Sequence, residues 1–86
     1  MSVECVAVEN GFVIRGIEGY PYDVLLEVAR PGWSASLIGE SGPASRDSAL
    51  TRTRAVERLL RQSLTDAAQL EAAMNEVNRS LEKYPE

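Results

Sequence analysis

Two short segments rich in valine and isoleucine, separated by Asn10-Gly11, predict a β-hairpin between residues 3 and 18. Residues 3–9 and 12–18 form its strands and Asn10-Gly11 its turn, because both turn residues tolerate the positive φ angles of a type I′ turn. In this register Glu9 lies opposite Phe12. We expect helices to cover one face and a partner chain the other, since both faces carry apolar side chains. One face has Val6, Val8, Val13 and Ile17 beside Glu4 and Arg15, and the other has Val3, Cys5, Ala7, Phe12 and Ile14.

A second hairpin is predicted over residues 22–29 and 33–39. The intervening Arg30-Pro31-Gly32-Trp33 has the composition of a type II turn, because proline presets φ at the second position and glycine accepts a positive φ at the third. The face expected to join the core carries Val24, Leu26, Val28, Ala35 and Leu37. The opposite face mixes polar and apolar residues: Asp23, Glu27, Ser34, Ser36, Leu25, Ala29 and Ile38.

The second part of the chain is predicted to be helical. No glycine or proline interrupts residues 45–84, and apolar residues recur at the 4-3 spacing of one helix face, with Val56, Leu60, Leu70, Met74, Val77 and Leu81 among them. Ser63 and Asp66 have the spacing of a fresh helix start. An unbroken helix would be roughly 60 Å long, well beyond the width of a four-stranded sheet. We therefore favour two helices with a break near Leu64 over one long kinked helix.

These elements predict an α+β fold, in which a four-stranded antiparallel sheet of two hairpins is followed by C-terminal helices packed on one face. We expect one domain over residues 1–86, with a β-sheet half at 1–40 and a helical half at 45–84. Ser45 or Asp47 is placed to cap the first helix. Eighty-six residues is close to the size at which a single core gives marginal stability, so a homodimer is expected.

Composition excludes several kinds of site. The chain has no histidine, which excludes a Ser-His-Asp triad, a Cys-His pair and a histidine-containing zinc site. Cys5 is the single cysteine and is interpreted as a buried small apolar residue rather than a reactive thiol. There is no phosphate-binding glycine loop and no metal-ligand cluster, so we expect no enzyme, no cofactor and no metal. The chain lacks an apolar run of membrane-spanning length and the features of a signal peptide, which predicts a cytoplasmic protein without a membrane partner.

Positive charge is concentrated in one segment. Residues 44–62 hold five arginines against two acidic residues, a net charge of +3, although the whole chain carries −4. Arg54, Arg58 and Arg61 follow one another at helical spacing and form an arginine ridge, with Arg52 displaced around the helix axis. Three interpretations remain open for these four arginines: a solvated helix face, a protein or intramolecular contact, and a nucleic-acid site. The acidic sheet weighs against nucleic acid, because affinity for phosphates comes mainly from a net basic surface.

Three aromatic residues fall at strand ends and turns. Tyr20, Tyr22 and Trp33 are expected either to cap the core or to serve as anchors in an interface. A pocket for a small molecule or peptide under these rings is a weaker alternative.

These observations favour a small non-enzymatic protein-interaction module. We expect a dimeric regulator, adaptor or inhibitor of bacterial or phage origin that acts by binding another protein. The alternative function is nucleic-acid binding through the arginines of the first helix. No sequence feature identifies the partner.

Overall fold

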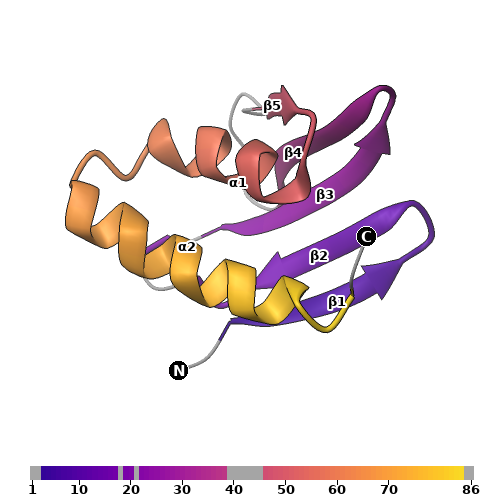
Figure 1. Ribbon diagram of the computed structural model, residues 1–86. Helices are drawn as coiled ribbons and strands as arrows, with labels where there is room; N and C mark the ends of the chain where they lie inside the picture. The colour runs from indigo at the N-terminus through magenta and orange to yellow at the C-terminus, as the bar shows by residue number, and fades with distance from the viewer. Residues whose placement is uncertain (1–2, 18, 21, 39–45, 85–86) are drawn as a thin grey trace.

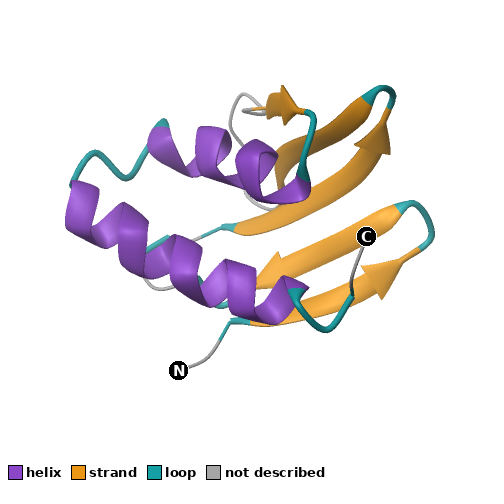
Figure 2. Cartoon of the chain, in the orientation of Figure 1, coloured by secondary structure: helices purple, strands orange, loops and turns teal. Residues whose placement is uncertain are grey.

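The computed structural model describes residues 3–17, 19–20, 22–38 and 46–84, and shows one antiparallel sheet with two helices on one face (Figures 1 and 2). Strands that are consecutive in sequence are neighbours in the sheet, without crossovers. The predicted α+β class, the antiparallel sheet and the C-terminal helices are confirmed. The sheet has five strands rather than four. The elements are β1 (Glu4–Val8), β2 (Gly11–Arg15), β3 (Asp23–Ala29), β4 (Gly32–Ile38), β5 (Arg46–Ala49), α1 (Arg52–Arg61) and α2 (Ala67–Leu81).

The fifth strand occupies the place where the helical half was expected to begin. Asp47 pairs with Ala35 and Ser48 with Ser34, so this short segment extends the sheet beside β4. Its sequence, RDSA, is too short and too polar to show strand alternation. The predicted helix cap at Asp47 is therefore wrong, and the alternative cap at Ser45 lies outside the described residues.

The first hairpin forms with a register different from the predicted one. Phe12 lies opposite Ala7 rather than Glu9, and Gly11 pairs with Val8 inside the ladder instead of forming the turn. The difference is two residues, and side chains alternate with a period of two, so the predicted face assignments within the strands are preserved. Ile17 departs from its predicted face: Gly16 has a φ of 76°, and after this glycine Ile17 enters the core.

The second hairpin also turns differently. Ala29 pairs with Gly32, so the two turn residues are Arg30 and Pro31, joined by a cis peptide bond. Gly32 lies in the ladder instead of at the third turn position, so the predicted type II turn is wrong. On the face predicted to join the core, Val24, Leu26 and Ala35 are buried and Leu37 is half-buried, whereas Val28, at the end of the sheet, is 53% exposed.

Two separate helices confirm the predicted break. The chain leaves the helical path after Gln62, and α2 begins after Asp66, whose carboxylate accepts a hydrogen bond from the backbone N–H of Ala68. The first helix starts after Thr51, whose hydroxyl accepts from the backbone N–H of Arg54. Neither described helix has the length and apolar character needed to cross a membrane.

The core lies between the helices and the sheet. Side chains at the centre of the sheet meet the apolar faces of both helices, and each fully buried Val or Leu contributes about 1.5–3 kcal/mol. The largest fully buried side chains are Ile14, Leu26, Leu59, Leu60, Val24, Val56 and Val77.

The described elements leave the other face of the sheet without a second layer (Figure 1). We call this the open face. Val6 lies beside Val13, and Val13 beside Leu25, so an apolar row crosses three strands there. Val6 is 39% exposed, and Val8 and Ile38 on the same face are exposed to a similar degree.

Candidate functional site

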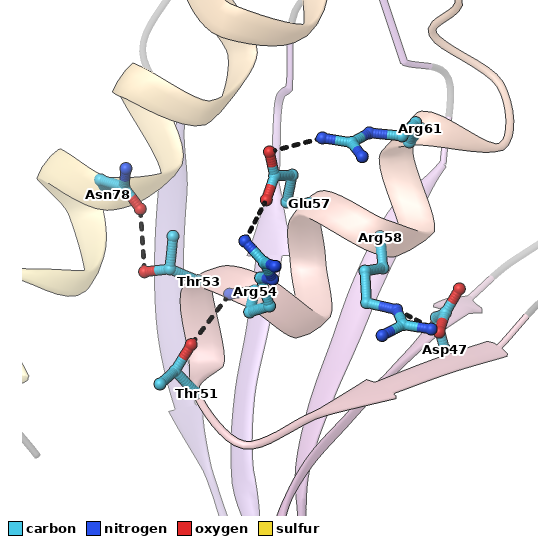
Figure 3. Close-up of polar contacts among 8 residues, drawn as sticks. All are labelled: Asp47, Thr51, Thr53, Arg54, Glu57, Arg58, Arg61 and Asn78. Atoms are coloured by element: carbon cyan, nitrogen blue, oxygen red, sulfur yellow. Dashed lines mark hydrogen bonds and ion pairs between the residues drawn. The ribbon is translucent and has the colours of Figure 1, made fainter.

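The arginine ridge lies along the outer side of α1, as the helical spacing predicts. Arg54, Arg58 and Arg61 line a shallow groove of about 350 Å³ together with Asp47, Glu57 and Gln62. Figure 3 shows acidic side chains beside the arginines: Glu57 of α1 lies between Arg54 and Arg61, and Asp47 of β5 lies beside Arg58. The groove therefore joins the first helix to the edge strand that the sequence did not reveal.

Each guanidinium of the ridge faces a carboxylate. Arg61 Nη2 lies 2.8 Å from Glu57 Oε2. Arg54 Nη1 lies 3.9 Å from Glu57 Oε1, so Glu57 stands between the two arginines. Arg58 Nε donates to Asp47 Oδ1 over 3.0 Å (Figure 3). Exposed pairs of this kind contribute about 0–1 kcal/mol each, but they reduce the net charge of the five groups to +1.

Arg52 does not belong to this groove. It is 9% exposed, and its guanidinium carbon lies 5.5 Å from the centre of the Phe12 ring and 6.0 Å from that of Trp33. Its Nη1 donates a hydrogen bond to the backbone carbonyl of Tyr84. Arg52 thus connects the start of α1 with two strands and the end of the chain, which is a structural role.

The three predicted aromatic residues do not share a site. Tyr20 and Tyr22 pack edge to face, with ring centres 5.8 Å apart, just before β3. Trp33 pairs with Val28 towards the other end of β3 and packs against Phe12 at 6.2 Å. The five residue steps from Asp23 to Val28 span about 17 Å of strand, so no common pocket lies under the three rings.

Burial affects two potentially reactive side chains. It raises the pKa of Tyr20 to about 12, with a smaller contribution from neighbouring Tyr22. Burial also raises the pKa of the Cys5 thiol, against the opposing positive charges of Arg52 and Lys83. Because the thiolate is the nucleophilic form, this environment does not activate Cys5. Within the described ranges, no three His, Cys, Asp or Glu side chains cluster as metal ligands.

The open face is the surface that the sequence indicated only in part. The apolar residues on both faces of the first hairpin were its signal. Leu25 and Ile38 were assigned to a mixed outward face, and only the register of β2 with β3 places Leu25 beside Val13. At one end of this face Arg15 lies 4.0 Å from Glu4 and 3.6 Å from Asp23, which forms a charged border beside the apolar row.

Fold and surfaces together define a small two-layer α+β protein with a charge-compensated groove on its first helix and a partly apolar open sheet face. The chain matches no protein-family model, and neither the curated proteins nor the solved structures provide a significant match.

Proposed function

We propose that this chain is a small non-enzymatic protein-interaction module that binds another protein through the open face of its sheet. The observation that carries the proposal is the apolar row Val6–Val13–Leu25, with Val8 and Ile38 nearby, on the face opposite the helices. Regulators, adaptors and inhibitors are all compatible with this mode of action.

The arrangement of side chains on the open face supports this proposal. Protein interfaces commonly have an apolar centre and a polar border. Here the Glu4–Arg15–Asp23 row borders the apolar row on one side, and Glu27 and Ser34 follow on the other side. Covering the remaining exposed area of a few Val and Ile side chains would contribute a favourable hydrophobic term at about 25 cal/mol per Å².

Nucleic-acid binding has less support. The three arginines of the ridge already face Glu57 or Asp47, and a phosphate would have to displace these carboxylates. Arg52, the fourth arginine of that hypothesis, is buried against the rings of Phe12 and Trp33. A chain with a net charge of −4 also gains little from counterion release.

The experiment compares two lysine variants at exposed apolar positions. Ile38→Lys places a charge on the open face, whereas Val28→Lys places one at the end of the sheet on the helix-covered side. Each tagged protein is crosslinked in a host lysate, and the captured proteins are identified by mass spectrometry. We expect the wild type and Val28→Lys to retain a common partner that Ile38→Lys loses, with all three proteins folded by circular dichroism. Retention of the same partner by Ile38→Lys would overturn the proposal.

A further inference from the structure

The two edges of the sheet differ in their capacity to pair with another strand. β5 is a four-residue edge with the polar sequence RDSA, and its Asp47 carboxylate is held by Arg58. β1 has five residues, ECVAV, and four of them are exposed. Natural edge strands are usually protected by a charge, a proline or a bulge near the middle, and the centre of β1 has only Val6 flanked by Cys5 and Ala7.

From this asymmetry we infer that β1 is the interface for a second copy of this chain, and that two β1 strands pair antiparallel across a two-fold axis at Val6. The pairing joins two five-stranded sheets into one of ten strands. Only one edge of each copy takes part, so the assembly closes as a dimer rather than growing into a fibre.

The side chains select this register. With Val6 opposite the partner's Val6, Glu4 lies opposite the partner's Val8 and no two carboxylates face each other. The apolar row of one copy, Val6–Val13–Leu25, then continues into the same row of the other. A register centred on Cys5 would place Glu4 against Val6 and interrupt the row. One centred on Ala7 would place Val6 opposite the partner's Val8 and offset the two apolar rows by two residues.

The helices leave room for this pairing. Ser80, near the end of α2, donates a hydrogen bond from its hydroxyl to the carbonyl of Val3, which fixes the helix beside the start of β1. In the proposed register, Val3 and the partner's Val3 are six residues apart along the joined strands, or about 20 Å. The two Ser80–Val3 contacts are therefore well separated along the joined strands. Tyr84, which follows α2, packs on Phe12 of β2 rather than beyond the β1 edge, and Val6, Ala7 and Val8 are exposed in the single chain.

In this register each residue of β1 lies opposite a partner residue from the same face of the sheet. Both helical layers therefore lie on the same side, and the two open faces form one continuous surface. The dimer forms without the protein partner proposed above. That partner would then bind the combined surface. Ile38 lies on β4, three strands away from the β1 edge, and separates the two proposals experimentally.

Disulfide trapping tests the register. In the Cys5→Ser background, Val6→Cys places two thiols directly opposite each other, at a Cα separation suited to a disulfide. Val8→Cys is the matched control, because its two thiols would be four residues apart, about 13 Å along the strands. We expect a disulfide-linked dimer on a non-reducing gel for the Val6→Cys protein and none for the Val8→Cys protein. Equal crosslinking of both, or none at position 6, would overturn the register.

Sedimentation equilibrium at micromolar concentration tests the dimer itself. Val6→Lys would bring two ammonium groups together at the axis, and we expect it to raise the dimer dissociation constant roughly tenfold or more. Ile38→Lys should sediment as a dimer even where it loses the captured partner. A wild-type protein that sediments only as a monomer, or a dimer weakened by Ile38→Lys and not by Val6→Lys, would refute the edge pairing.

Discussion

Replacing Arg52 by methionine tests whether this buried cation stabilises the fold. Methionine retains most of the apolar stem and removes the guanidinium. The guanidinium lies over the Phe12 ring at 5.5 Å and near Trp33 at 6.0 Å, and it donates to the carbonyl of Tyr84. The substitution thus removes contacts that join α1, two strands and the C-terminal residues.

The expected loss is about 2–3 kcal/mol. Cation–π contacts with little exposure to water contribute about 1–2 kcal/mol, and a hydrogen bond from a charged donor about 1.5–3 kcal/mol. Part of this sum is offset, because Arg52→Met also removes the cost of burying a charge. For a domain of this size, the remaining loss corresponds to a decrease in Tm of about 10–20 °C.

The assay is urea unfolding followed by circular dichroism and by fluorescence of Trp33, the single tryptophan. Arg61→Met is the matched control, because its side chain is exposed and its ion pair with Glu57 lies on the surface. We expect the control to change the free energy of unfolding by less than about 0.5 kcal/mol. Arg52→Lys should give an intermediate loss, since lysine keeps the charge but lacks the flat guanidinium. The reasoning fails if Arg52→Met costs no more than Arg61→Met.

Two further predictions concern Gly32 and Tyr20. Gly32→Ala would place a Cβ 2.2 Å from the carbonyl oxygen of Ala49, so β4 and β5 must separate. Urea unfolding should show a loss of about 1–3 kcal/mol in the free energy of unfolding, and an unchanged midpoint would contradict the close approach. The raised pKa of Tyr20 means that the unfolded chain ionises first, so its contribution to stability is complete below pH 10 and declines as pH rises towards about 12. Tyr20→Phe should flatten this decline in the urea midpoint, and an equally steep decline in the variant would exclude Tyr20 as its source.

The arrangement of layers could be predicted from periodicity alone. Both hairpins and the sheet face that meets the helices follow from the spacing of apolar residues. The break before α2 was indicated instead by the spacing of Ser63 and Asp66, and the residue that caps α2 is Asp66. The faces predicted for the residues of β1 and β2 are correct although the register was wrong by two residues, because side chains alternate between the two faces with a period of two. β5 was missed because a four-residue polar strand carries no such pattern.

Two glycines show why the turns were predicted wrongly. Gly11 and Gly32 were both interpreted as turn residues with positive φ, yet both lie in strands. A Cβ on Gly11 would lie 1.9 Å from the carbonyl oxygen of Leu26, and one on Gly32 would meet Ala49. Each glycine allows a neighbouring strand to approach closely, and this requirement depends on a partner distant in sequence. Local composition does not distinguish it from the requirement of a turn.

The arginines of residues 46–61 explain why the candidate site was only partly predictable. A segment with five arginines suggests one basic surface, but the fold distributes them among three environments. Arg46 pairs across strands with Ser36 in the sheet, Arg52 is buried, and the three arginines of the ridge face carboxylates. Asp47 reaches Arg58 only because β5 adds to the sheet beside β4. Part of the basic segment therefore forms a charge-compensated groove. The apolar residues of β1 to β3, which are dispersed in the sequence, align as the row on the open face. This is why the strands, rather than the arginines, provide the better-supported binding surface.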